Sequence, residues 1–209
     1  MFVPEYRRPQ IISVSDIEPI TLDEAVENLR VVDPQNNSPE IYPESDRILK
    51  LITAARQTVE EELDMSLVPT TIQVTQSSLY PTIIALPRGP VRDIISVTYV
   101  DTEGYDTVLA TDQYRLSTAG HIAMLRPAYG VTWPTDVRTD DESVRVVYSA
   151  GYSTDSPPEA VPQAILQAMH LLIGHWFANR EAVVVGTITA EVPLSVRYIL
   201  SKYRTGLGV

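Results

Sequence analysis

The spacing of apolar residues changes twice along this chain, and that pattern constrains the fold more than any other feature. Before residue 68 and after residue 150, apolar residues recur every three or four positions, as on one face of a helix. Between Val68 and Ser149 they alternate with polar residues, and β-branched residues dominate. The sequence therefore predicts an α+β fold, with a helical bundle from the N- and C-terminal segments and an inserted antiparallel β-lobe.

Three expected domains follow from these changes of spacing. Residues 1–67 form an N-terminal arm and the first helices, with residues 1–19 extended and without periodicity. Residues 68–150 form the inserted β-domain. Residues 151–209 form the C-terminal helices that complete the helical domain, followed by a flexible tail.

Two helices are expected in the N-terminal segment. Thr21 and Glu24 have the spacing of a capping box, so a helix begins at Thr21. A longer helix is capped by Ser45 or Asp46 and runs to about Met65. Its apolar positions are Ile48, Leu49, Ile52, Ala55, Val59 and Leu63. Its acidic end, formed by Glu60, Glu61, Glu62 and Asp64, is interpreted as a solvated face, with a partner-facing patch as the alternative.

The β-lobe is expected to be a series of short strands. Candidate strands are residues 70–76, 82–86, 93–100, 105–110, 113–117, 121–126 and 143–149. In the third of them Ile95, Val97 and Tyr99 are expected to share one face. Gly104 suits the positive φ of a hairpin turn over residues 101–104, and residues 127–142 form a long loop rich in Pro and Asp.

The segment 160–178 is unusually apolar, with 13 apolar residues of 19 and no charge. A narrow polar stripe, together with Pro162 and His175, argues against a membrane span, as does the lack of flanking basic residues. The stripe consists of Gln163, Gln167, His170 and Gly174. The segment is therefore expected to be a central helix, and its excess apolar surface leaves a second role at a subunit interface equally open.

The composition excludes several classes of function. The chain has 209 residues and no cysteine, which removes disulfides, thiolate nucleophiles and cysteine-ligated zinc. Its net charge is −11, and Arg7–Arg8 is the only adjacent basic pair. Tight binding of duplex DNA by a monomer is therefore not expected, because such binding draws on Lys and Arg contacts to phosphate. An acidic surface past which DNA slides remains compatible with this charge.

No catalytic, cofactor or metal site is expected. The chain lacks the P-loop, GxGxxG, GxSxG and HExxH motifs. His170 and His175 are five residues apart and diverge by roughly 140° around a helix, so they cannot chelate one ion. With His121, they are interpreted as structural histidines. Acid pairs such as Asp101/Glu103 and Asp140/Asp141 fall in turns, and a carboxylate-based hydrolase on the β-lobe is kept as an alternative of a different class.

Two sets of candidate interface residues follow from the apolar and basic surfaces. A short C-terminal helix from Pro193 has a basic, aromatic end, which complements the helix dipole and also suits a partner interface. The candidate partner-interface residues are Arg197, Tyr198, Lys202, Tyr203, Arg204 and Leu207. The candidate subunit-interface residues are Ile52, Val59, Leu166, Met169, Ile173, Trp176 and Phe177.

Seven segments together resemble a known family, although each is a loose match by itself. They are 20–31 (ITLDEAVENLRV), 46–63 (DRILKLITAARQTVEEEL), 86–104 (LPRGPVRDIISVTYVDTEG), 112–117 (DQYRLS), 144–152 (VRVVYSAGY), 161–183 (VPQAILQAMHLLIGHWFANREAV) and 191–204 (EVPLSVRYILSKYR). In order and spacing the chain resembles the head–tail connector (adaptor) proteins of tailed bacteriophages, in the long form with a β-rich insert. The loops at 33–44 and 127–142 look particular to this sequence.

The resemblance implies a non-enzymatic virion protein at the head–tail junction, made in the host cytoplasm. Such adaptors form a ring, typically twelve-fold, beneath the portal, extend the DNA channel and meet the next neck or tail-completion protein. By this resemblance, the helices at 46–63 and 161–178 build the ring, residues 193–209 reach the portal, and DNA passes without tight binding. No cofactor and no membrane are implied. The alternatives are another neck or tail-completion subunit and a transient DNA-packaging regulator.

Overall fold

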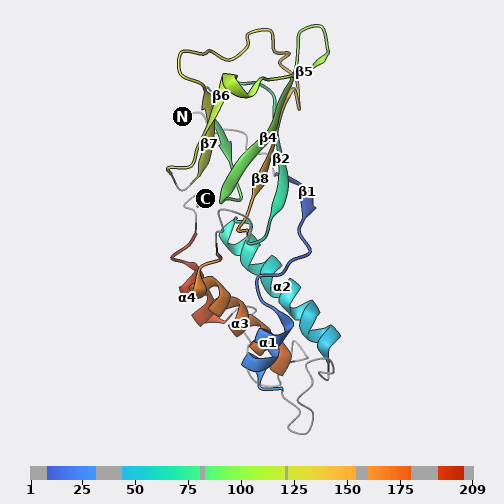
Figure 1. Cartoon of the computed structure of the whole chain (residues 1–209), viewed down its shortest axis with the longest axis vertical. Helices are drawn as coiled ribbons and strands as arrows, with labels where there is room; N and C mark the ends of the chain where they lie inside the picture. Colours follow the sequence, from blue (N-terminus) through green and yellow to red (C-terminus); the bar gives the residue numbers. More distant parts are fainter. Residues whose placement is uncertain are drawn as a thin grey trace. The chain divides into compact units, whose positions relative to one another are not determined.

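A computed structural model describes residues 9–31, 44–80, 83–120, 122–153, 160–179 and 193–204 (Figure 1). Within these residues the chain has a mixed α+β fold, as the sequence predicts. The strands are β1 (Gln10–Val14), β2 (Thr70–Gln76), β3 (Ile84–Leu86), β4 (Val91–Val100), β5 (Asp106–Val108), β6 (Tyr114–Ser117), β7 (Ala123–Pro127) and β8 (Val144–Ala150). The helices are α1 (Leu22–Leu29), α2 (Ser45–Leu63), the short 3-10 helix η1 (Thr111–Gln113), α3 (Gln163–Ala178) and α4 (Leu194–Leu200).

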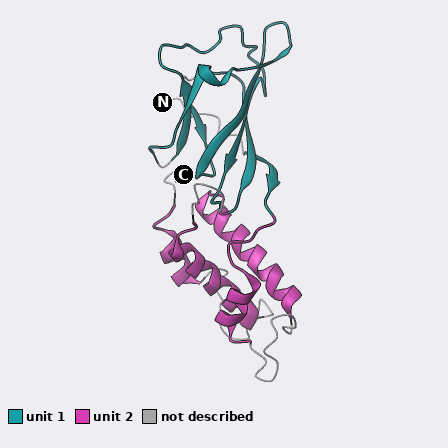
Figure 2. Cartoon of the chain, in the orientation of Figure 1, with its two compact units in different colours: residues 1–15, 68–153 teal, residues 16–67, 154–209 magenta. Residues whose placement is uncertain are grey.

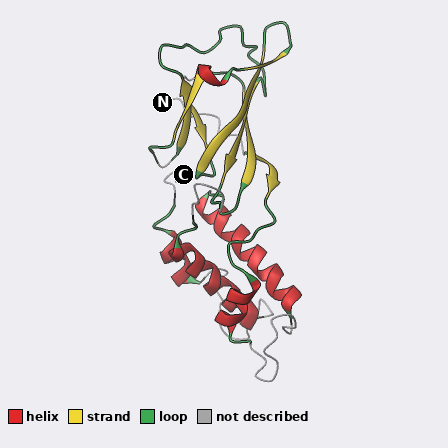
Figure 3. Ribbon diagram, in the orientation of Figure 1, coloured by secondary structure: helices red, strands yellow, loops and turns green. Residues whose placement is uncertain are grey.

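The chain divides into two compact units, which Figure 2 colours separately. The β unit comprises Met1–Ser15 and Val68–Ser153, and the helical unit comprises Asp16–Leu67 and Thr154–Val209. The strands belong to the first unit and α1–α4 to the second (Figure 3). The expected domain 1–67 therefore differs from the structure at its start, because β1 pairs with β2 and belongs to the β unit.

The larger sheet of the β unit has the strand order β1-β2-β8-β4-β5 and is antiparallel throughout. Its central pair, β2 and β8, runs in unbroken register from Thr70↔Ala150 to Gln76↔Val144. Alternate residues of β8 are buried, as the alternation in the sequence predicts. They are Val144, Val146, Tyr148 and Ala150.

The edge strand β1 was not predicted. All five of its residues are exposed, so no alternation of buried and exposed positions marks it in the sequence. A register shift between Ile11 and Ser13 further interrupts its pairing with β2. Such a strand is defined by its partner rather than by its own pattern.

The smaller sheet has the order β3-β7-β6 and shares one apolar core with the larger sheet. Ile72 and Val146 come from the larger sheet, and Ile84 and Leu125 from the smaller one. Trp133 anchors the long loop after β7, since its side chain is only 2% exposed in the same core. This loop therefore packs as part of the β unit.

A bulge in β4 corrects one expectation about side-chain direction. Val97 and Tyr99 are buried on one face as predicted, but Ile95 is 55% exposed. The register shifts between Ile94 and Ser96, which turns Ile95 away from the core. The hairpin that follows forms as predicted, with Gly104 at φ 95°.

The helical unit begins with the predicted capping box. The Thr21 amide donates to Glu24 Oε2 at 2.8 Å, and the Glu24 amide donates to Thr21 Oγ1 at 3.3 Å. The start of α2 differs from the prediction, because Glu44, in a left-handed conformation, is its N-cap rather than Ser45 or Asp46. Helix α2 packs against α1 and α3, and α3 packs against α4.

Candidate assembly surfaces

Four of the residues expected at a subunit interface are core residues. Ile52, Val59, Met169 and Ile173 are at most 1% exposed, and they lie on α2 and α3, which pack together. A side chain already covered within its own chain offers no surface to a second copy. The expectation for these four residues is therefore corrected: their helical spacing marks the stripe that faces the neighbouring helix.

The remaining three candidates stay partly exposed, one in the first turn of α3 and two in its last turn. Leu166, Trp176 and Phe177 are half-buried. Arg47 Nη2 donates to the carbonyl oxygens of Trp176 at 3.3 Å and Phe177 at 3.1 Å. Its guanidinium carbon also lies 4.8 Å from the centroid of the Phe177 ring. These contacts fix the last turn of α3 and hold its aromatic surface in one orientation.

Helix α4 exposes a stripe that the sequence analysis identified only in part. Leu194 and Tyr198 are exposed at i and i+4 of α4, and exposed Lys202 lies in the turn that follows, with its ammonium 5.0 Å from the Tyr198 ring centroid. We call these three residues the α4 stripe. Leu194 was missed, although its spacing to Tyr198 places both on one face. Arg197 is exposed beside the stripe.

Arg204, in the segment that follows α4, has an ion-pair partner within the chain. Arg204 Nη2 forms an ion pair with Glu62 Oε1 of α2, and Tyr203 is half-buried. Leu207 lies outside the described residues. Arg204 therefore ties the segment after α4 to α2 in this structure, and its charge is partly neutralised there.

The acidic end of α2 is not simply a solvated face. Glu60 is 6% exposed, and its Oε2 lies 2.9 Å from Nη1 of Arg56, itself buried. Arg56 Nε also pairs with Glu18 Oε2 at 2.8 Å, and the Leu67 amide donates to Glu60 Oε1 at 2.8 Å. Burial lowers the pKa of Arg56, but the hydrogen bonds and charges of Glu18 and Glu60 outweigh it and raise that pKa. The solvated interpretation is therefore wrong for Glu60, while Glu61 is exposed.

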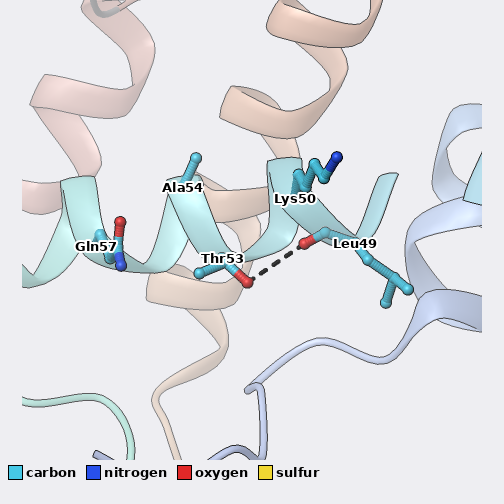
Figure 4. Close-up of a pocket in the computed structure, with 5 residues that line it drawn as sticks. All are labelled: Leu49, Lys50, Thr53, Ala54 and Gln57. Atoms are coloured by element: carbon cyan, nitrogen blue, oxygen red, sulfur yellow. Dashed lines mark hydrogen bonds between the residues drawn. The ribbon is translucent and has the colours of Figure 1, made fainter. Parts of the chain in front are cut away.

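The outer side of α2 carries a shallow hollow of about 310 Å³ (Figure 4). It is lined by Leu49, Lys50, Thr53, Ala54 and Gln57, and we call this surface the α2 face. Leu49 was expected in the buried stripe but is exposed, because Ile48 occupies the core position beside it. The Thr53 hydroxyl donates to Glu18 Oε1 at 2.8 Å. Most of the accessible surface that lines the hollow is apolar, although Lys50, Thr53 and Gln57 border it.

The carboxylates and histidines do not converge on a reactive centre in the described residues. No three His, Asp or Glu side chains there are grouped as metal ligands, and His121 lies outside the described part. Asp101 Oδ1 accepts the amides of Glu103 and Tyr105, which closes the hairpin turn. Asp140 pairs with Arg138 at 3.0 Å. Among the described helices, none combines the length and apolar character that a membrane crossing requires.

His170 makes the stability of the chain depend on pH. Burial lowers its pKa below the ordinary 6.5, and the charge of Glu24 opposes this only partly. Well above pH 6.5 both the folded and unfolded states hold it neutral; as pH falls, the unfolded state takes up the proton first. The free energy of unfolding should therefore fall as pH drops from 6.5 toward the folded pKa.

Urea unfolding across this range should show a shallower fall in the free energy of unfolding for His170→Gln than for the wild type. His175→Gln, on the same helix, retains His170 and should keep the slope; equal slopes for wild type and His170→Gln would contradict the prediction.

Comparison with known proteins gives a match at the level of fold. No protein-family model matches the sequence, and no curated protein matches it. Solved structures of gene transfer agent (GTA) particles do match. One matching chain is in the neck of an empty GTA particle computed with C6 symmetry, with 19% identity, a TM-score of 0.75, and coverage of 97% of this chain and 98% of that one.

Two further chains give the same result. One is in the virion of a native GTA particle, with 19% identity, a TM-score of 0.73 and coverage of 97% and 98% of the two chains. The other is in the neck of a native GTA particle computed with C12 symmetry, with 19% identity, a TM-score of 0.66 and coverage of 96% and 97%. The chain thus has the fold of chains found in the neck and virion of GTA particles.

Proposed function

We propose that this chain is a structural subunit of the neck of a phage-like particle, where it serves as the head–tail adaptor. It forms a ring under the portal, extends the DNA channel and joins the capsid to the tail. The observation that carries the proposal is the fold match over 97% of this chain and 98% of a GTA neck chain. The match includes both the helical and the β unit, so it concerns the whole subunit rather than one common module.

The symmetry of the matched necks supports a ring of identical copies, with twelve as the expected number. Those necks were computed with C6 and C12 symmetry. A closed ring needs two different surfaces on each copy, one for each neighbour. The helical unit offers the α2 face and the half-exposed last turn of α3, which carries Trp176 and Phe177. We assign these two surfaces to contacts between successive copies.

The remaining surfaces are assigned to other partners. The α4 stripe with Arg197 meets the portal, because a basic, aromatic surface on an acidic protein suits an acidic partner groove. The β unit meets the next neck or tail-completion protein. The net charge of −11 supports passage of DNA without capture, because acidic side chains repeated around a channel repel phosphates.

The proposal is tested with the full chain and the portal protein of the same particle. Electron microscopy of the mixture should show a ring of this chain on one end of the portal. Absence of the chain from purified particles would instead identify a packaging factor. Binding to the tail tube without binding to the portal would identify a tail-completion protein, and either result would overturn the adaptor assignment.

Ala54→Arg is expected to abolish ring formation on the portal while leaving the fold intact. The substitution puts a long, charged side chain into the hollow of the α2 face, where Ala54 is a half-buried lining residue. The free energy of unfolding should change by less than about 1 kcal/mol, since the new side chain extends into solvent. Native mass spectrometry of the portal complex counts the bound copies. Ala54→Ser preserves the volume and should bind in normal number; an intact ring with Ala54→Arg would remove the α2 face from the subunit contact.

A further inference from the structure

The smaller sheet of the β unit carries two arginines side by side on its outer face. Strands β6 and β7 pair so that Arg115 lies directly opposite Arg126. Directly opposite residues of an antiparallel pair share a face, and like charges in that position destabilise the sheet. The neighbouring positions Leu116 and Leu125 point to the core face instead. The arginine pair therefore weakens the sheet unless an anionic group lies against it.

The chain supplies no such group in the part that the structure describes. Arg115 is exposed, and neither arginine forms an ion pair among the described residues. Arg126 is half-buried; its Nε is buried without a hydrogen-bond partner, and its Nη2 lies 3.2 Å from the Met124 sulfur.

The rest of this face is apolar, which favours a protein partner over DNA. Ala85 is exposed and Met124 is half-buried, and the register of β3, β7 and β6 puts both on the face with Arg115 and Arg126. Exposed Ile83 directly precedes β3, two residues before Ala85. We call these five residues the arginine face. Arg and Met beside aliphatic side chains are typical of protein interfaces, whereas a surface that follows a phosphate backbone is lined by several cations and polar groups.

A surface with exposed acidic and apolar residues, complementary to the arginine face, lies on the opposite flank of the β unit. The β4–β5 hairpin exposes Glu103 and Tyr105 at its turn, and Asp106 and Val108 on one side of β5; we call these four residues the hairpin surface. Tyr105 is 67% and Val108 68% exposed. Asp106 also pairs with Arg145 at 2.5 Å, so Glu103 is the acid that this surface offers to a partner's cation. In Figure 1, β6 and β7 lie on the left of the β unit and β5 on the right.

We propose that the arginine face of one copy binds the hairpin surface of the next, so that the β units of the ring are joined head to tail. Glu103 meets Arg115 and Arg126, while Tyr105 and Val108 cover the aliphatic part of the face. The charges are complementary, and two different surfaces on opposite flanks are what a closed ring requires. The inference rests on the proposed ring and adds the β unit to its contacts.

A charge swap tests the pairing. Arg115→Glu and Glu103→Arg should each weaken association between copies about tenfold, because each places like charges across the contact. The double variant should restore it, since the opposite charges then meet in reversed order. Association is measured by sedimentation velocity of the full chain and by the number of copies bound to the portal. Arg30→Glu, with the same change of charge on the exposed end of α1, should have no effect. Failure of the double variant to restore what the single variants lose would overturn the inference.

The absence of cysteine allows a second, independent measurement on ring-bearing portal complexes. Ser117→Cys, on the outer face of β6, combined with Tyr105→Cys should give a disulfide ladder of successive multiples under oxidation. Either variant alone should give no product beyond a dimer. A ring without a ladder would overturn this inference and leave the proposed function standing, whereas no ring with wild-type protein would overturn the proposed function itself.

Binding to labelled duplex DNA tests the alternative partner. If the double variant Arg115→Glu, Arg126→Glu lost DNA binding while the ring stayed intact, the arginine face would be a nucleic-acid surface and the inference would be wrong.

Discussion

Gly151→Ala should lower the free energy of unfolding of the β unit by about 3–5 kcal/mol, from backbone strain together with overpacking. Gly151 has φ 97°, and a Cβ at this position would lie 2.0 Å from the Val68 carbonyl oxygen. That oxygen belongs to the backbone, so it cannot rotate away as a side chain would. Urea unfolding followed by the fluorescence of the buried Trp133 measures the effect, in a Trp176→Phe background that leaves one tryptophan.

Gly104→Ala is the matched control for this substitution. Gly104 has nearly the same φ, 95°, but a Cβ added there would have no atom of another residue within 4 Å, apart from its chain neighbours. It should therefore show only the conformational cost, about 1–2 kcal/mol. The difference between the two variants measures the close approach of Gly151 to Val68. Equal losses would contradict a steric conflict at Gly151.

Glu60→Ala should lower the free energy of unfolding of the helical unit by about 3 kcal/mol, because it breaks a buried ion pair and leaves a buried amide without its acceptor. Arg56 would keep only Glu18, and the Leu67 amide would lose the 2.8 Å hydrogen bond to Glu60 Oε1. The effect is measured by urea unfolding with far-ultraviolet circular dichroism, which follows the helices.

The neighbouring residue provides the control for Glu60. Glu61 is exposed, so Glu61→Ala should change the free energy of unfolding by no more than about 0.5 kcal/mol. Glu60→Gln keeps an oxygen acceptor for the Leu67 amide but loses the charge beside Arg56, so its loss should be intermediate. Equal effects of alanine at 60 and 61 would mean that the ion pair and amide bond contribute nothing net.

Features that depend on neighbours in the sequence were predicted well. The capping box of Thr21 and Glu24 needs only residues three apart, and the hairpin at Gly104 needs only one residue that tolerates positive φ. The alternation of Val144, Val146 and Tyr148 likewise shows which side of β8 is buried. In each case the physical determinant is local, so one stretch of sequence contains it.

Features set by distant partners were missed or misread. Glu60 looks like its exposed neighbour Glu61, and only its contact with Arg56 and the position of Glu18 explain its burial. Edge strand β1 becomes a strand through pairing with β2, some sixty residues later. A bulge exposes Ile95 in β4. In all three cases the deciding energy comes from tertiary contacts, which periodicity does not encode.

The candidate interfaces were also hard to predict from the sequence, because burial within the chain depends on tertiary contacts. Apolar spacing led to Ile52 and Met169 being chosen as subunit-interface residues, but they lie on helix faces that the chain itself covers. The α2 face and the arginine face carry mixed residue types, such as Thr53 beside Ala54 or Arg126 beside Met124. Such surfaces become recognisable only when the fold shows which side chains lack a covering neighbour.

The pairing of Thr70 with Ala150 ties the two ends of the insert together and so changes how the helices find each other. Paired strands lie about 5 Å apart, so a folded insert turns a long connection between Leu63 and Gln163 into a short one. On the (3/2)RT ln n scaling, this shortening reduces the entropic cost of docking α3 onto α2 by about 1–2 kcal/mol. During synthesis the whole insert precedes α3. The β-sheet can therefore form first and bring the ends of the insert together before α3 docks onto α2.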